Sequence, residues 1–155
     1  MTTIRKATID DARELALLLR GIGWFEKFNA AEIEASTGQV RARLEQCLAD
    51  DSHLILVAED ADAKIAAYSS VHWLPYLFMT GPEGYVSELF VSAAARGRGI
   101  GRELLGAIEK AARARGCQRL SLTNLRTRES YRRQFYNKAG WCERSEAANF
   151  IYPLS

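Results

Sequence analysis

The chain has 155 residues with 48% apolar and 26% charged side chains and a net charge of +2, which fits one domain over residues 1–155 with a core of ordinary size and hardly two. No apolar run approaches the roughly 20 residues of a membrane-spanning helix, and the first residues lack the apolar stretch of a secretion signal, so we expect a cytoplasmic protein without a membrane partner. The cysteines Cys47, Cys117 and Cys142 lie far apart without a Cys-x-x-Cys pair, which argues against a disulfide framework and against a metal site.

The first half of the chain alternates helical and strand patterns. Asp10 and Asp11 are candidate helix caps, and an apolar stripe follows at Leu15, Leu18 and Leu19. Two apolar runs then flank an Asp-Ala-Asp-Ala turn, as in a hairpin. The patterns predict, in order, a strand at 3–7, a helix from 10 or 11 to 21, an irregular aromatic stretch at 24–28, a helix at 33–48, and hairpin strands at 53–59 and 64–72.

The second half continues the alternation. Gly116 is a natural stop for the apolar helical stripe that precedes it. The patterns predict, in order, a loop at 73–84, a strand at 85–91, a glycine-rich turn, a helix at 100–115, a strand at 119–123, a helix at 129–138 and a strand near 149–152. Helices interleaved with strands indicate a layered α/β domain.

Charge is distributed unevenly along the chain. Residues 1–95 carry 8 basic and 14 acidic side chains, net −6, whereas residues 96–144 carry 13 basic and 4 acidic ones, net +9. The basic half favours an anionic ligand. Its basic residues are spread over helical patterns without a nucleic-acid-binding motif, so we expect no nucleic-acid partner and rank a nucleic-acid-associated protein last among the alternatives.

A glycine-rich segment joins the predicted strand at 85–91 to the predicted helix at 100–115. A helix N-terminus presents unpaired N–H groups and the positive end of its dipole, and glycines let a phosphate approach the backbone. A tight turn would require one or two glycines for its dihedral angles, but not three that alternate with arginines. The segment predicts a phosphate-binding site with the candidate residues Arg96, Gly97, Arg98, Gly99, Ile100, Gly101 and Arg102.

Two common nucleotide sites do not match this segment. A dinucleotide fingerprint has the spacing Gly-x-Gly-x-x-Gly, whereas here the third glycine comes one residue early and the next predicted strand ends without an acidic ribose ligand. An NTPase phosphate loop requires Gly-Lys-Ser or Gly-Lys-Thr, which the chain lacks. Both interpretations are therefore weakened.

Two motifs at characteristic separation match a known family. Arg96, Gly99 and Gly101 fit the signature of Arg or Gln, two variable residues, Gly, one variable residue, and Gly or Ala. Residues 135–141, Phe-Tyr-Asn-Lys-Ala-Gly-Trp, form the second motif, an aromatic-Tyr pair that ends in glycine and an aromatic. On these motifs and on the order of its predicted elements, the chain resembles the GNAT superfamily of N-acetyltransferases over essentially its whole length. The resemblance implies an α/β (α+β) fold: a mixed, mostly antiparallel central sheet with splayed parallel strands, flanked by helices on both faces.

The resemblance also implies how the co-substrate acetyl-CoA binds. Its pyrophosphate would be held by backbone N–H groups from Arg96 to Gly101, and its pantetheine arm by the main chain of Phe90 and Val91. The strands that splay apart to admit the arm would be those at 85–91 and 119–123.

The chain departs from the family pattern at three positions. Ala93 stands where relatives often have proline, Arg132 where a small residue is common, and Glu129 where asparagine is often seen. These departures bear on how the cofactor is placed beside the helix at 129–138, where Arg132 or Arg133 could instead reach a phosphate.

Acetyl transfer to an amine requires the uncharged amine, yet an aliphatic amine with a pKa near 10 is uncharged in only about one molecule in a thousand at neutral pH. Glu88, in the strand beside the expected thioester, is the candidate base, and His72 is the second. Tyr136 is the candidate acid for the departing thiolate and, by the resemblance, also a cofactor contact. Purely structural roles stay open for all three. No cysteine has a recognisable activating partner, so we expect direct transfer in a ternary complex.

The predicted acceptor is a primary amine of a small molecule or peptide. We expect it to approach between the aromatic segments 21–29 and 73–84, and the acidic excess of the first half favours a cationic acceptor. An alternative function is a non-catalytic acyl-CoA-binding sensor or regulatory module, which would need neither Glu88 nor Tyr136. The resemblance is also compatible with a homodimer.

Overall fold

The structure is a computed structural model that describes residues 1–155. The chain forms two compact units, Met1–Ser121 and Leu122–Ser155. The first unit contains nearly all of the sheet and the helices that cover it, and the second contains two short helices and the C-terminal segment. The single acetyltransferase domain expected from the sequence stays a prediction.

The elements follow the predicted order closely. The first unit contains β1 (Thr3–Lys6), the 3-10 turn η1 (Ile9–Asp11), α1 (Ala12–Ile22), α2 (Glu26–Ala30), α3 (Ile33–Leu48), β2 (His53–Glu59), β3 (Ile65–Leu74), β4 (Glu83–Val91), the 3-10 turn η2 (Ala93–Ala95), α4 (Ile100–Ala114) and β5 (Arg119–Leu122), whose last residue opens the second unit. The second unit contains α5 (Glu129–Arg132) and α6 (Phe135–Lys138). None of these helices has the length and apolar character needed to cross a bilayer.

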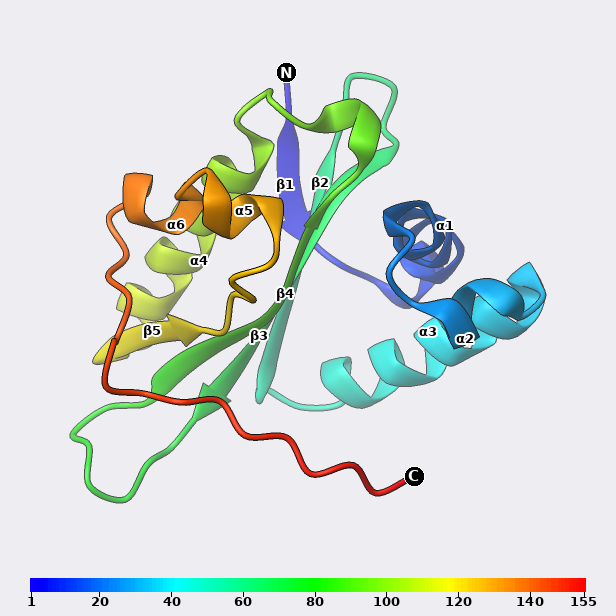
Figure 1. Cartoon of the computed structure of the whole chain (residues 1–155). Helices are drawn as coiled ribbons and strands as arrows, with labels where there is room; N and C mark the ends of the chain where they lie inside the picture. Colours follow the sequence, from blue (N-terminus) through cyan, green and yellow to red (C-terminus); the bar gives the residue numbers. More distant parts are fainter. The chain divides into compact units, whose positions relative to one another are not determined.

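The five strands form one sheet in the order β1-β2-β3-β4-β5 (Figure 1). Neighbours from β1 to β4 are antiparallel, and β5 forms a parallel pair with β4. The hairpin between β2 and β3 turns at Asp60, whose carboxylate accepts the N–H groups of Asp62 and Lys64 at 2.9 and 3.0 Å. This is the mixed, mostly antiparallel sheet that the sequence predicts.

Helices cover both faces of this sheet, with α1 and α3 together on one face and α4 on the other (Figure 1). Their apolar residues recur every three or four positions, so that α1 buries Leu15 and Leu18, and α4 buries Leu104 and Ile108. Each such side chain contributes about 1.5–3 kcal/mol when it is fully buried rather than exposed. The predicted arrangement of helices on both faces is confirmed.

β5 accompanies only the first half of β4. The Gln118 N–H donates to the Pro82 carbonyl at 2.9 Å, which sets the register of the two parallel segments. β5 ends at Leu122, four residues after Gln118, whereas β4 continues to Val91. Residues 88–91 of β4 therefore extend beyond the last residue of β5.

Three predicted elements differ in extent. Residues 24–28, expected to be irregular, lead into the short helix α2. The loop predicted at 73–84 is shorter, since β3 continues to Leu74 and β4 begins at Glu83. The single helix predicted at 129–138 is two helices, because Gln134 has a φ of 56° in the left-handed region and interrupts the helical backbone.

The prediction of a strand near residues 149–152 is wrong. Residues 142–155 are exposed and contain no strand, and Phe150, Ile151 and Tyr152 have relative exposures of 91%, 81% and 86%. Apolar residues at strand-like positions do not suffice, because a strand is stable only when a neighbouring strand satisfies its main chain.

Candidate active site

The turn between η2 and α4 has the backbone that its glycines predict. Gly97 and Gly99 have φ values of 77° and 81°, in the left-handed region that other residues rarely adopt. Gly101 lies buried in the first turn of α4. The dihedral angles alone therefore account for two of the three glycines, as a tight turn would require.

The same turn leaves amide groups without main-chain acceptors. The N–H groups of Arg102 and Glu103 both bond to the Gly99 carbonyl at 3.0 Å, whereas those of residues 97–101 make no main-chain hydrogen bond. A Cβ added to Gly97 or Gly99 would meet no heavy atom within 4 Å, so the turn borders open space. The exposed arginines of this turn are Arg96, Arg98 and Arg102. Unpaired amides at a helix N-terminus beside cationic side chains fit a diphosphate group.

Arg96 connects this turn to the end of β4. Its Nε donates to the Val91 carbonyl at 3.3 Å, so one acceptor position of that carbonyl is already in use. Phe90 and Val91 lie in the part of β4 that β5 does not reach. The Phe90 ring packs at 5.7 Å from the ring of Trp24 and at 5.8 Å from that of Tyr68. The Phe90 side chain therefore faces α1 and the residues that follow it, while its main chain pairs with Tyr68 on β3.

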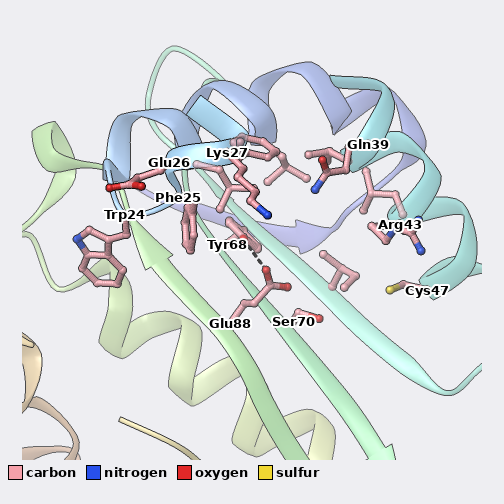
Figure 2. Close-up of a pocket in the computed structure, with 16 residues that line it drawn as sticks. Trp24, Phe25, Glu26, Lys27, Gln39, Arg43, Cys47, Tyr68, Ser70 and Glu88 are labelled. Carbon is pink, nitrogen blue, oxygen red and sulfur yellow. Dashed lines mark hydrogen bonds between the residues drawn. The ribbon is translucent and has the colours of Figure 1, made fainter. Parts of the chain in front are cut away.

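A cavity of about 840 Å³ lies between the sheet and the helices α1, α2 and α3 (Figure 2). Aromatic and aliphatic side chains, among them Trp24, Phe25 and Phe28, form much of its wall. The polar side chains that line it are Glu26, Lys27, Gln39, Arg43, Cys47, Tyr68, Ser70 and Glu88. A concave, mostly apolar space of this size with a few polar groups is typical of a small-molecule site.

Glu88 lies on the floor of this cavity, at a β-bulge. The register shifts after the pair Ser70–Glu88, which leaves Ser87 as an extra residue of β4. The Tyr68 hydroxyl donates a hydrogen bond to Glu88 Oε1 at 3.1 Å (Figure 2). Burial raises the pKa of Glu88 above its usual value, and the bond from Tyr68 opposes part of that shift. The Glu88 carboxyl therefore holds a proton more tightly than an exposed glutamate does.

His72, the second candidate base, does not line the cavity. Its Nε2 lies 2.8 Å from Ser87 Oγ, and its ring lies 4.4 Å from that of His53. Burial and then the neighbouring His53 lower the pKa of His72, which favours the neutral ring. Its contacts are those of a strand residue packed against its neighbours.

Tyr136 belongs to the second unit, and its surroundings there are aromatic. Its ring lies 4.9 Å from that of Phe135 and 6.1 Å from that of Trp141. Burial raises the pKa of Tyr136, and the charge of Arg133 opposes part of the shift. The phenol therefore stays protonated at neutral pH, as a proton donor must.

The two segments expected to flank the acceptor differ in their relation to this cavity. Segment 21–29 contributes Trp24 to Phe28 to the cavity, but segment 73–84 contributes nothing, because it joins β3 and β4 at the end of the strands remote from Glu88. The sequence patterns did not point to α3, which supplies Gln39, Arg43 and Cys47 to the cavity. The signal was their spacing of four residues, which places three polar side chains on one face of a helix.

The chain matches the family model described as the acetyltransferase (GNAT) family over residues 21–141. The chain belongs to the GNAT acetyltransferase family. The matched range of this GNAT protein includes Glu88, the whole cavity floor on β4, and the glycine-rich turn.

Relatives of this GNAT protein carry the names of acetyltransferases. It is 35% identical over 108 residues to glucosamine 6-phosphate N-acetyltransferase 1 of Oryza sativa subsp. japonica, which covers 68% of this chain and 63% of the relative. The chain therefore spans slightly less than two thirds of that relative. It is 28% identical over 156 residues to aminoglycoside N(6')-acetyltransferase type 1 of Stenotrophomonas maltophilia, with coverage of 98% and 94%. Its fold is similar to that of glucosamine-6-phosphate N-acetyltransferase from Arabidopsis thaliana, with a TM-score of 0.77, 24% identity and 99% coverage of both chains.

Proposed function

We propose that this GNAT protein is an acetyl-CoA-dependent N-acetyltransferase that moves an acetyl group onto a primary amine by direct transfer in a ternary complex. The observation that carries the proposal is the partly buried carboxylate of Glu88, on the floor of a cavity and on the strand that leads into the glycine-rich turn. A base for an amine and a site for a diphosphate thus lie on one continuous segment, residues 88–101.

The turn from Arg96 to Gly101 is the proposed site of the diphosphate, because its amides lack main-chain acceptors and it borders open space. Beyond the end of β5, the main chain at Phe90 and Val91 is the proposed contact for the amide groups of the pantetheine arm. Arg102 adds a cation at the first turn of α4. When bound, acetyl-CoA supplies an acetyl group activated as a thioester.

Glu88 is the proposed base that takes a proton from the acceptor amine, directly or through one water. A carboxylate whose pKa is raised by burial is a stronger base than an exposed one. Tyr68 would hold its Oε1, which leaves the other oxygen for the amine. Removal of a proton from the ammonium form frees the nitrogen lone pair to attack the thioester carbonyl.

Tyr136 is the proposed donor to the departing sulfur. An unperturbed thiol has a pKa of about 8.5 and a phenol one of about 10, so full proton transfer is uphill by roughly 2 kcal/mol without further tuning. The raised pKa of Tyr136 increases the difference between the pKa values of the phenol and the thiol. Its role is therefore chiefly a hydrogen bond that stabilises the developing thiolate.

A covalent route through Cys47 is disfavoured, although this thiol lines the cavity. Burial, and then the charge of Glu88, raise the pKa of Cys47, which keeps the thiol protonated and weakly nucleophilic. Direct attack by the amine fits the remaining groups better.

The acceptor is proposed to be a small molecule. The cavity of about 840 Å³ has the size of a small-molecule site. The relatives named above act, by their names, on glucosamine 6-phosphate or on aminoglycosides, which are amino sugars with primary amines. An amino sugar is therefore the first class of acceptor to test.

The decisive experiment follows the release of free thiol from acetyl-CoA with a panel of amines, for wild type, Glu88→Gln, Tyr136→Phe and the exposed control Glu45→Gln. Loss of the base or of the donor should lower kcat by about 100-fold or more, while the control should match wild type. A Tyr136→Phe variant with the full rate would remove Tyr136 as donor, and an unchanged pH profile in Glu88→Gln would remove Glu88 as base.

Calorimetry with acetyl-CoA separates the remaining alternatives. Binding without thiol release from any amine would support the non-catalytic sensor or regulatory module. No heat of association would contradict the proposed function as a whole.

A further inference from the structure

Two cationic side chains line the roof of the cavity that holds Glu88. Lys27 extends from α2 and Arg43 from α3, and Figure 2 shows the Lys27 ammonium directed into the space above Tyr68 and Glu88. Gln39 precedes Arg43 by four residues on α3, so both lie on the helix face that borders the cavity. The two cations therefore belong to the site rather than to an unrelated surface.

Neither cation has an ionic partner within the protein. None of the ion pairs of the chain includes Lys27 or Arg43. Arg43 instead donates from Nη1 to Gln46 Oε1 at 2.5 Å, which leaves most of its guanidinium donors unused. The site thus holds two positive charges that the chain itself does not neutralise.

The carboxylates of the cavity do not change this conclusion. Glu88 is held on the floor by Tyr68. Glu26 lines the cavity at the end where Trp24 lies, and its carboxylate points away from Lys27 (Figure 2). Negative charge therefore lies on the floor and at one end, and positive charge lies on the roof.

This separation of charge describes the molecule that would fit. On the basis of the proposed function, we propose that the acceptor is an amine that also carries an anionic group, a phosphate or a carboxylate, which binds to Lys27 and Arg43 while the amine faces Glu88. Guanidinium and ammonium groups on two different helices can hold such an anion from two sides. A polycationic acceptor carries no anionic group, so its charges would be repelled by Lys27 and Arg43.

Paired acceptors that differ only in the anion test the proposal. The first pair is glucosamine 6-phosphate and glucosamine, and the second is β-alanine and its amide. Wild type should favour the anionic member of one pair, and Lys27→Gln or Arg43→Gln should each raise its KM by roughly 10- to 100-fold with little change in kcat. The matched control is Arg41→Gln, on the same helix but outside the cavity lining, and it should behave as wild type.

The pair that responds to the two variants identifies the anion as a phosphate or a carboxylate. If both pairs show equal kcat/KM for their two members, or if the best acceptors of the whole panel are neutral amines or a polycation such as sisomicin, the proposal is wrong. Lys27 and Arg43 are exposed, so the variants should fold.

The proposed function can fail while this inference stands. If no amine releases thiol, calorimetry with glucosamine 6-phosphate and with β-alanine decides. Heat that is present in wild type and lost in the Lys27→Gln Arg43→Gln double variant upholds an anion site in the cavity. Absence of heat with either compound overturns it.

Discussion

The Tyr68 hydroxyl and the Glu88 carboxylate are joined by a hydrogen bond of 3.1 Å that runs between neighbouring strands of the sheet. Burial, and then the charge of Glu88, raise the pKa of Tyr68, so the phenol is a hydrogen-bond donor at neutral pH. The bond stabilises the charged carboxylate, whereas burial opposes it. Glu88 is therefore a group whose proton affinity depends on one nearby residue that can be changed without altering the shape of the core.

Tyr68→Phe should shift the acidic limb of the activity profile to higher pH. Without the donated bond the charged form of Glu88 loses stabilisation, so its pKa rises further and less of the base is charged at a given low pH. On that limb kcat/KM should fall by roughly 3- to 10-fold, and at high pH the two enzymes should converge. A pH series of thiol release checks this, and a profile that superimposes on wild type would show that Tyr68 does not act on the base.

Glu88→Gln should become progressively more stable than wild type as pH rises. The folded protein raises the pKa of Glu88 above the ordinary glutamate value of 4.5, so the folded state binds this proton more tightly than the unfolded chain does. The associated stability is present at low pH and is lost as pH rises from about 4.5 through the folded-state pKa. Urea unfolding at several pH values measures the difference, with the exposed Glu45→Gln as control. A difference that is constant with pH would contradict the shift.

Gly99→Ala should destabilise the protein and weaken acetyl-CoA binding. Gly99 has a φ of 81°, and an L residue in that conformation costs about 1–2 kcal/mol. Gly106 is the matched control, because it lies on α4 with ordinary helical geometry and with nothing within 4 Å of an added Cβ. Gly106→Ala should stabilise the protein by about 0.5–1 kcal/mol and leave cofactor affinity unchanged. Thermal unfolding and calorimetry with acetyl-CoA distinguish the two variants, and equal effects would refute the argument.

Gly84→Ala should destabilise the protein by about 1–3 kcal/mol through overpacking. A Cβ at Gly84 would lie 2.5 Å from Leu120 Cδ2 and 2.9 Å from the Trp73 ring, so these two packed side chains would have to shift. Gly38→Ala on α3 meets no neighbour and should not lower stability. Chemical unfolding tests the pair. Equal stability of the Gly84 variant and wild type would mean that Leu120 and Trp73 yield without cost.

The sequence by itself determined the features that depend on neighbouring residues. Apolar residues at helical spacing fixed α1, α3 and α4, the Asp60 turn fixed the hairpin, and Gly97 with Gly99 fixed the left-handed turn before α4. Each of these follows from local backbone preference or from a repeat of a few residues. The motifs that carry the family resemblance are also short and local, so the sequence alone shows them.

Only the tertiary structure decided what surrounds Glu88. Tyr68, Lys27 and Arg43 come from different elements, and strand register together with helix packing brings them to one cavity. The same long-range contacts kept His72 out of the cavity and left residues 149–152 without a strand partner. Packing between distant segments depends on how the faces of helices and of the sheet fit together, and the spacing of residues along the chain does not determine that fit.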